Sequence, residues 1–268
     1  MGSAIYLFCL ARSSLLPAFE GTGLDDQDSL FPHNFLEIAA VVSLVSLEEF
    51  CGPSAESRMQ DLSWVGPRAC RHEEVVEQVM HHSPVLPVRF GTIFSSLKSL
   101  EERLKEHHGA ISEFLDQVVD MEEWAVKGLL DRAKAEEELL AKILVREAGR
   151  LASLSPGMRY FQEQRILAGV EKELNGWLKE VCEKAAMDLS RYASDFCERK
   201  VLSRKAAESD GDMVLNWAFL VPRRAMADFR AKIDWVNADE AQHGLVFKLS
   251  GPWPPYSFSP SLEVEPES

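Results

Sequence analysis

Seven histidines are the most obvious metal-binding side chains of this chain. A helical zinc site places two imidazoles on one face, four residues apart, as in the zincin motif. His72 is followed by two glutamates but not by the second histidine of that motif. The pairs His81-His82 and His107-His108 are adjacent, so their side chains point in different directions on a helix. We therefore predict solvated or helix-capping histidines and no metal site.

Motifs for nucleophilic catalysis and for phosphate binding do not occur in the sequence. There is no Gly-x-Ser-x-Gly turn to present a serine, and residues 21–23 form an isolated Gly-x-Gly within a loop. The five cysteines are widely spaced and never form Cys-x-x-Cys, which favours buried, reduced thiols. The sequence therefore predicts that the protein is not an enzyme and binds no cofactor.

Residues 84–94 are the segment that most resembles a site. Pro84 and Pro87 restrict the backbone, Gly91 permits a positive φ, and Arg89 is a charged fork within a predicted apolar strand. In one interpretation, Arg89 pairs with a carboxylate at a domain junction and fixes the orientation of the domains. In a second, Arg89 lies with Phe90 and Phe94 in a partner-binding groove. An anion or cofactor pocket is a third.

Residues 251–258 read Gly-Pro-Trp-Pro-Pro-Tyr-Ser-Phe. Three prolines fix φ and remove backbone donors, so we expect the preceding strand to stop here. The predicted product is a stiff, polyproline-like arm that carries Trp253, Tyr256 and Phe258. Such an arm loses little entropy on docking, either to its own domain or to a partner.

The composition is that of a folded globular protein, with 46% hydrophobic and 27% charged residues. The net charge of −14 repels phosphate backbones, so nucleic acid is not expected as a partner. No apolar run reaches the roughly 18–20 residues that span a bilayer, so membrane insertion is not expected either. The apolar start reads as a strand and not as a signal peptide.

The first half of the chain, residues 1–120, is predicted to form an α+β domain. Its predicted strands lie at residues 5–10, 35–45 and 85–90, and its predicted helices lie at residues 47–50 and 68–82. An irregular excursion over residues 17–33 and a loop over residues 51–65 connect them. Ser95 or Ser96 caps a last helix, whose apolar positions recur as far as Val118.

The second half alternates strands and helices in the order strand–helix–strand–strand–helix–strand. The predicted strands lie at residues 124–130, 198–203, 213–221 and 244–250. A pair of helices at residues 132–152 and 159–196 forms the first crossover, and a helix at residues 223–236 forms the second. An Asp-Gly turn at residues 210–211 joins the two middle strands. We therefore predict an α+β protein whose residues 121–251 form a ferredoxin-like βαββαβ domain with an enlarged helical crossover, followed by a C-terminal tail at 252–268.

Three of these segments resemble one protein family. The family is that of the gas vesicle accessory proteins GvpF and GvpL, and the first similar segment is the tail motif at residues 251–258. The second is Ser-Pro-Val-Leu-Pro-Val-Arg-Phe-Gly-Thr-Ile-Phe at residues 83–94, after a helix opened by His72. The third is Glu-Trp-Ala-Val-Lys at residues 123–127. The match runs in order from the first strand to Phe258. The chain departs from the family at residues 156–161, where Tyr160 is kept but a Tyr-Leu pair followed by basic residues is not.

The resemblance implies a cytoplasmic assembly factor of gas vesicles, which are hollow shells of a small, very hydrophobic protein. Its implied partners are that shell protein and other accessory proteins, and its implied state in isolation is a monomer, although the apolar stripe of the long helix equally suits a second copy. Candidate partner-binding or domain-junction residues are Arg89, Phe90, Phe94, Trp124, Tyr160, Trp253, Tyr256 and Phe258. A ferredoxin-like regulator that binds a small ligand is the alternative.

Overall fold

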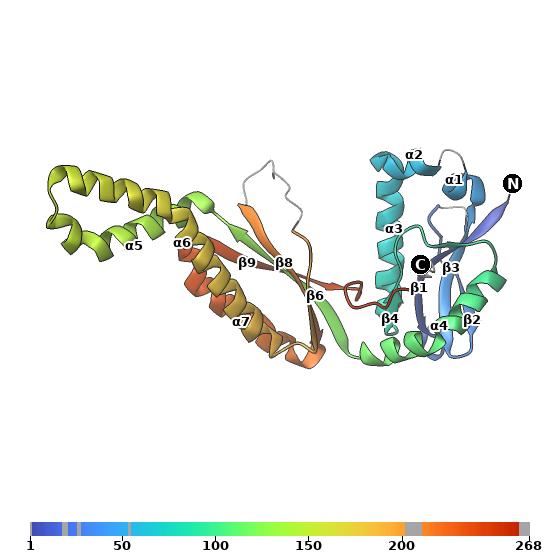
Figure 1. Ribbon diagram of the computed structural model, residues 1–268. Coiled ribbons are helices and arrows are strands. Elements are labelled where there is room, and N and C mark those ends of the chain that lie inside the picture. Colours follow the sequence, from blue (N-terminus) through green and yellow to red (C-terminus); the bar gives the residue numbers. More distant parts are fainter. Residues whose placement is uncertain (1, 18–20, 26–27, 53–54, 202–210, 263–268) are drawn as a thin grey trace. The chain divides into compact units, whose positions relative to one another are not determined.

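The computed structural model describes residues 2–17, 21–25, 28–52, 55–201 and 211–262. It is a mixed structure of helices and sheets (Figure 1). The chain divides into two compact units, Met1–Glu123 with Pro252–Ser268, and Trp124–Gly251. The described part of the predicted tail, residues 252–262, thus groups with the first unit.

The first unit is built on an antiparallel sheet with β1 at its centre. Its strands are β1 (Ser3–Arg12), β2 (Phe31–Phe35), β3 (Ile38–Ser46), β4 (Val85–Pro87) and β5 (Ile93–Phe94). The strand order is β2-β3-β1-β4, and β5 also pairs with β1. Because β4 and β5 lie beside the same strand, the loop that joins them runs along one edge of the sheet.

The strand predicted at residues 35–45 is confirmed over residues 38–45, which belong to β3, but its start is wrong because a separate strand, β2, ends there. β2 ends at Phe35 and β3 begins at Ile38, and Leu36 takes a positive φ of 53° in the tight turn between them. The sequence of β2, Phe-Pro-His-Asn-Phe, contains a proline and an asparagine, which are depleted in strands. Pro32 is tolerated because β2 is an edge strand, where a missing backbone donor faces no partner.

Helices cover both faces of this sheet. They are η1 (Ser13–Leu15), α1 (Leu47–Cys51), α2 (Ala55–Gln60), α3 (Leu62–Met80) and α4 (Leu97–Gln117). Tyr6 and Phe8 share one face of β1 and pack with Val75 and Val79 of α3. α4 packs against β1 and β4 from the other side (Figure 1). Its predicted cap is confirmed, since Ser96 accepts a hydrogen bond from the backbone of Ser99 at 3.2 Å.

The predicted loop at residues 51–65 is also wrong, since α2 and the start of α3 occupy part of it. Asp61 caps α3 by accepting the Ser63 amide at 2.9 Å, a local signal that the hydrophobic pattern does not contain. Consequently His72 lies inside α3 and does not open it. The third strand is shorter than predicted, because β4 ends at Pro87 and leaves Arg89 in the following loop.

The second unit contains a four-stranded sheet with the order β7-β8-β6-β9. Its elements are β6 (Met121–Leu130), α5 (Arg132–Ala152), α6 (Pro156–Ser190), β7 (Asp195–Glu198), β8 (Asp212–Pro222), η2 (Arg223–Ala225), α7 (Met226–Glu240), η3 (Ala241–His243) and β9 (Leu245–Trp253). α6 and α7 lie side by side on the sheet (Figure 1), and their apolar residues share one core with β6 and β8.

Within this unit, the helix predicted at residues 132–152 is confirmed, with Asp131 as its cap. The next helix ends at Ser190 and not near residue 196 as predicted. Phe196 continues the helical spacing by coincidence. It belongs to β7, where its ring lies 4.9 Å from that of Phe219. β7 therefore overlaps the strand predicted at 198–203 only at Glu198. Residues 202–203 of that prediction lie outside the described residues, as does Asp210 of the predicted turn.

The prediction that the last strand stops before the prolines is wrong. β9 continues through Gly251 and Pro252 to Trp253. The physical reason is its position, because β9 is an edge strand of the sheet and Pro252 need not donate to a neighbour. The residues that follow form a turn, in which Phe258 donates its backbone N–H to Pro255 at 3.2 Å, and not a polyproline arm.

Candidate functional site

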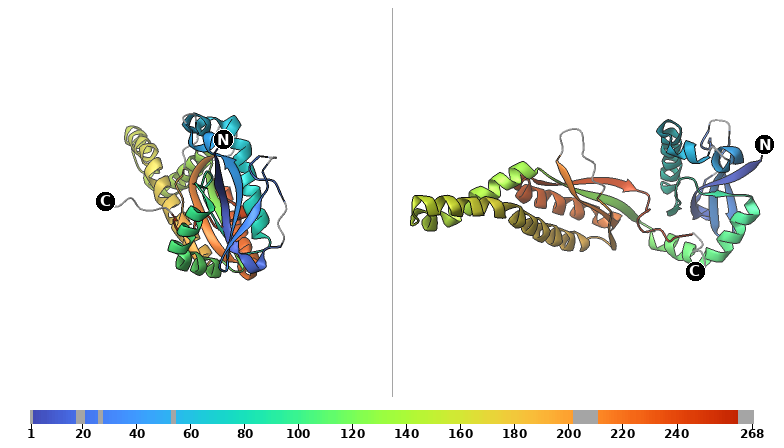
Figure 2. Two further views of the ribbon diagram at one scale, coloured as in Figure 1. Left: turned by 90° about the vertical axis from the view of Figure 1, so that its right-hand side faces the viewer. Right: turned by 45° about the horizontal axis from the view of Figure 1, so that its top comes forward.

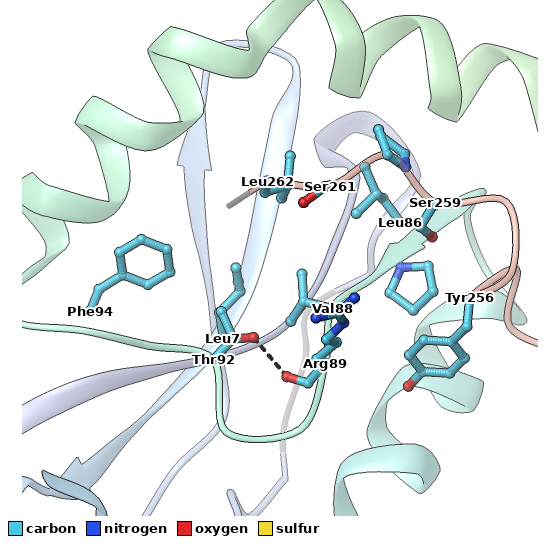
Figure 3. Close-up of a pocket in the computed structure, with 12 residues that line it drawn as sticks. Leu7, Leu86, Val88, Arg89, Thr92, Phe94, Tyr256, Ser259, Ser261 and Leu262 are labelled. Atoms are coloured by element: carbon cyan, nitrogen blue, oxygen red, sulfur yellow. Dashed lines mark hydrogen bonds between the residues drawn. The ribbon is translucent and has the colours of Figure 1, made fainter. Parts of the chain in front are cut away.

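A cavity of about 200 Å³ lies in the first unit, between the sheet edge and the C-terminal tail. Figure 3 shows tail residues Ser259 and Leu262 facing the loop that carries Arg89. The lining residues are Leu7, Leu86, Pro87, Val88, Arg89, Thr92, Phe94, Tyr256, Ser259, Pro260, Ser261 and Leu262. The cavity thus combines an apolar floor with hydroxyl groups and one guanidinium.

The loop beside this cavity is held from behind by a buried chain of hydrogen bonds. His72 donates from Nε2 to the carbonyl of Val88 at 3.1 Å, so its Nδ1 accepts from the Tyr6 hydroxyl at 2.9 Å. The Gly91 amide in turn donates to the Tyr6 oxygen at 3.0 Å. Gly91 has φ +86°, which favours glycine at this turn. Both ends of the loop are therefore fixed to the core through one histidine and one tyrosine.

Burial keeps this histidine neutral. His72 is only 2% exposed, and desolvation lowers its pKa from 6.5 to about 4, against a smaller raising effect of the hydrogen bond to Val88. Burial likewise raises the pKa of Tyr6 well above its usual value. The sequence-based expectation of a solvated or capping histidine is therefore wrong for His72, because α3 turns it into the core.

The His72 pKa predicts an acid-sensitive fold. Between pH 6.5 and about 4 the unfolded chain binds a proton that the folded protein excludes. The free energy of unfolding should therefore fall as pH drops through this window, by on the order of 3 kcal/mol in full. Urea unfolding of the wild type and of His72→Gln, followed between pH 7 and pH 4, measures it. An equal pH slope in both proteins would show that His72 is not responsible.

The tail is fastened by two carboxylates from distant parts of the sequence. Tyr256 donates its hydroxyl to Glu73 of α3 at 2.9 Å, and Ser257 donates its amide and its hydroxyl to Glu123 at 2.9 and 3.1 Å. Glu123 is only 1% exposed. Burial raises the pKa of Glu73, although the Tyr256 hydroxyl lowers it. These bonds hold the aromatic turn against the first unit and close one side of the cavity.

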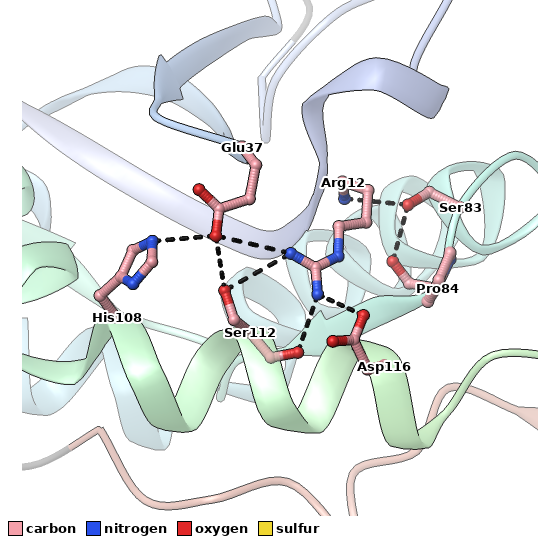
Figure 4. A network of polar contacts seen from close by, with 7 residues as sticks. All are labelled: Arg12, Glu37, Ser83, Pro84, His108, Ser112 and Asp116. Atoms are coloured by element: carbon pink, nitrogen blue, oxygen red, sulfur yellow. Dashed lines mark hydrogen bonds and ion pairs between the residues drawn. The ribbon is translucent and has the colours of Figure 1, made fainter.

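A second polar network joins the end of β1 to α4 (Figure 4). Arg12 donates to the Ser112 carbonyl at 2.8 Å and pairs with Asp116 at 2.5 Å. Glu37 accepts from the Ser112 hydroxyl at 2.8 Å and lies 3.0 Å from His108. Its own backbone amide, then Ser112 and His108, lower the pKa of Glu37 to about 2. This network stiffens the unit but does not reach the cavity.

The predicted site residues separate into two groups. Arg89, Phe94 and Tyr256 line the cavity, and Thr92 donates to the Arg89 carbonyl at 2.7 Å (Figure 3). The other predicted residues lie elsewhere. Phe90 packs on the first core, Trp124 is buried in the second core with the Arg230 guanidinium 5.8 Å from its ring, Tyr160 is exposed on α6, Trp253 is partly exposed at the end of β9, and Phe258 is half-buried in the tail turn.

Sequence reasoning did not predict the role of the residues that hold this site, namely Tyr6, His72, Glu73, Glu123 and Ser257. One signal was available for Glu123, which directly precedes Trp124 in a predicted apolar strand. A carboxylate that faces inward from such a strand needs hydrogen-bond partners. The others had no local signal. Within the described residues, no His, Cys, Asp and Glu side chains gather into a group that could hold a metal ion. In the same part of the chain no helix is long and apolar enough to cross a membrane.

Known proteins match this chain over most of its length. A family model described as gas vesicle synthesis protein GvpL/GvpF matches residues 4–260. Gas vesicle protein L of Streptomyces sp. (strain CB03234) is 24% identical over 85% of this chain and 82% of that protein. Gas vesicle protein F of the same strain is 28% identical over 94% of this chain and 98% of that protein.

The fold is also similar to that of a solved structure. The crystal structure of the gas vesicle protein GvpF from Anabaena sp. PCC7120 superposes with a TM-score of 0.72 at 18% sequence identity, covering 97% of this chain and 99% of that one. That likeness concerns the fold alone, whereas the family model covers nearly every residue of the chain, including all three resembling motifs. The chain belongs to the gas vesicle synthesis protein GvpL/GvpF family.

Proposed function

We propose that this protein is an accessory factor of gas vesicle formation that binds the hydrophobic shell protein, and other accessory proteins, while the shell grows. The family match over residues 4–260 is the observation that carries the proposal. A shell monomer with exposed apolar surface aggregates unless something covers it. A carrier with a net charge of −14 remains dispersed while it does so. We further propose that it works in the cytoplasm, at the gas vesicle.

The contact that we propose for the shell protein is the cavity between the sheet edge and the tail. Leu86, Val88 and Phe94 offer an apolar floor at the scale of one or two inserted side chains. Arg89 is exposed at the rim and suits an acidic group beside the inserted segment. In this proposal Arg89 contributes to partner binding, the second of the interpretations that its sequence context left open.

Filling the cavity should abolish this binding without unfolding the protein. Ser261 is exposed at the cavity wall, so Ser261→Trp places an indole there while sparing the core. We expect at least a tenfold loss of affinity for purified shell protein, with an unchanged melting temperature. Arg89→Ala should lose affinity in the same way. The readouts are co-purification and the amount of shell protein that stays in solution.

Leu62→Ser is the matched control, because Leu62 is 84% exposed on α3 and does not line the cavity. It should bind the shell protein as the wild type does. If the wild type neither co-purifies with the shell protein nor keeps it in solution, the proposed function is wrong. If Ser261→Trp and Arg89→Ala both bind normally, the contact lies elsewhere on the protein. A loss of melting temperature in Arg89→Ala would favour its purely structural role.

For the second unit we propose a ferredoxin-like βαββαβ arrangement with α5 and the first part of α6 inserted in the first crossover. The strand order β7-β8-β6-β9 and the packing of α6 and α7 in one core with β6 and β8 support this assignment. Because such domains often bind small effectors, thermal shifts across a metabolite panel would test the regulator alternative. Among the described residues of the second unit, no observation favours that alternative over the assembly role.

A further inference from the structure

An apolar and cationic surface lies at the far end of the helical hairpin formed by α5 and α6. We call residues 143–167 the hairpin tip. Figure 2 shows this hairpin extending beyond the strands of its own unit. Its exposed apolar side chains are Leu144, Val145, Met158, Tyr160, Phe161 and Leu167. Phe161 is 72% exposed, and its ring contacts that of Tyr160 with centroids 5.9 Å apart. Exposed clusters of this kind mark interaction sites.

The hairpin tip also has the residue types of a binding interface. Aromatic residues, methionine and arginine are enriched in protein interfaces and among their energetic hot spots. On α6, Tyr160, Gln164 and Leu167 follow one another at spacings of four and three, which places them along one outward stripe with Phe161 beside it. Val170 lies buried elsewhere on the same helix. The stripe is therefore left over after α6 has packed on its own unit.

The charge of the hairpin tip opposes that of the whole chain. Residues 143–167 contain four arginines and two glutamates, whereas the protein carries −14. Arg159 pairs with Glu163 at 2.9 Å, and Arg150 pairs with Glu147 at 3.2 Å, so the two glutamates are engaged. Arg165 is exposed beside the aromatic pair. A partner for this surface should be acidic and should present an apolar side chain.

The same unit carries a surface with that chemistry. A small cavity between α6 and α7, which we call the α6–α7 groove, is lined by Ala185 and Trp235 and by three carboxylates against one lysine, namely Asp188, Asp239, Glu240 and Lys184. Trp235 is 55% exposed. Lys232 pairs with Asp188 at 2.7 Å, but among the described residues one carboxylate oxygen of Glu240 is buried without a hydrogen-bond partner. Burial and then Asp239 raise the pKa of Glu240, so a cation paired with this carboxylate would stabilise its charged form.

The two surfaces cannot meet within one molecule. Phe161 and Ala185 lie on the same continuous helix, α6. At 1.5 Å per residue they are about 36 Å apart along its axis. Any contact between the hairpin tip and the α6–α7 groove is therefore a contact between two molecules.

We propose that the hairpin tip of one copy binds the α6–α7 groove of a second copy. Lys232 Nζ lies 4.0 Å from the centroid of the Trp235 ring, so Phe161 packs against the opposite face of that ring. Arg165 pairs with Asp239 and Glu240. Because the two surfaces differ, the contact is heterologous, and repeating it gives a ring or an open chain of copies. At low protein concentration the monomer is then the main species. The proposal is independent of shell-protein binding, which we assign to the first unit.

Two charge reversals test this contact without touching the core. Arg165→Glu makes the tip acidic, and Asp239→Arg makes the groove basic near the end of α7, where a cation suits the helix. Sedimentation velocity of the full chain at rising concentration should show association of the wild type that weakens with added salt. Each variant alone should associate at least tenfold more weakly. An equimolar mixture of the two should associate again, because every tip then finds an opposite groove.

The controls separate this contact from others. Glu102→Arg, an equal charge change at an exposed position on α4, should associate as the wild type does. Phe161→Ser should weaken association as strongly as Arg165→Glu. If Asp239→Arg alone associates normally, the contact is not with the groove and the proposal is wrong. A wild type that stays monomeric at its highest soluble concentration overturns it outright, as does a mixture that fails to recover.

Discussion

Replacing His72 with alanine is expected to lower the free energy of unfolding by about 4 kcal/mol. The imidazole is buried and stacks on Phe8, with ring centroids 5.5 Å apart. Its removal leaves a cavity between α3 and the sheet. It also leaves the Tyr6 hydroxyl and the Val88 carbonyl without the partners that they have in the folded protein. Urea unfolding at pH 7, where His72 is neutral, gives the change directly.

His82→Ala is the matched control, since His82 is exposed just beyond α3 and should change stability by less than about 0.5 kcal/mol. Tyr6→Phe removes one hydroxyl from the same chain of bonds and should cost about 2 kcal/mol. Because both residues act in one network, the double variant should lose less than the sum of the single variants. A loss below about 1 kcal/mol for His72→Ala would contradict the proposed role of this network.

Replacing Glu123 with alanine is expected to release the tail and to destabilise the first unit by about 3 kcal/mol. Glu123 is buried and accepts both the amide and the hydroxyl of Ser257. Without it, the turn at residues 255–258 loses its main anchor and the half-buried N–H of Ser257 loses its acceptor. We expect faster cleavage of the C-terminus by a protease under native conditions, measured by mass spectrometry, together with a lower melting temperature.

Tyr256→Phe should give a weaker form of the same result, because it removes only the hydrogen bond to Glu73. Glu113→Ala provides the comparison at an exposed position on α4 and should leave cleavage unchanged. If Glu123→Ala keeps the tail as protected as it is in the wild type, packing of the prolines holds it and the carboxylate does not.

Local signals in the sequence predicted those elements whose stability is local. The helix at 132–152 is stabilised locally, since its cap Asp131 accepts the amide of Lys134, only three residues further on. The strand at the centre of the first sheet is a continuous apolar run, as a strand buried on both faces must be. The family resemblance likewise depends on short motifs read directly from the chain, and the family model confirms it.

Errors arose where a neighbour distant in the sequence decides the outcome. Pro252 was expected to end its strand, yet the edge position of β9 leaves its missing donor without consequence. Phe196 matched a helical period but pairs with β8 in a sheet. Arg89, Phe94 and Tyr256 were proposed together, but nothing local indicated that the tail would close over the loop that carries the arginine.

Residue types and short spacings along the chain are enough to identify the family and to predict the mixed helix and sheet composition. His72 becomes a buried neutral link between positions 6 and 88 in the folded protein alone, and there too residues 73 and 123 come to hold the tail. Hydrogen bonds and burial act through space, so residues far apart along the chain acquire their roles only when the fold brings them within about 3 Å of each other.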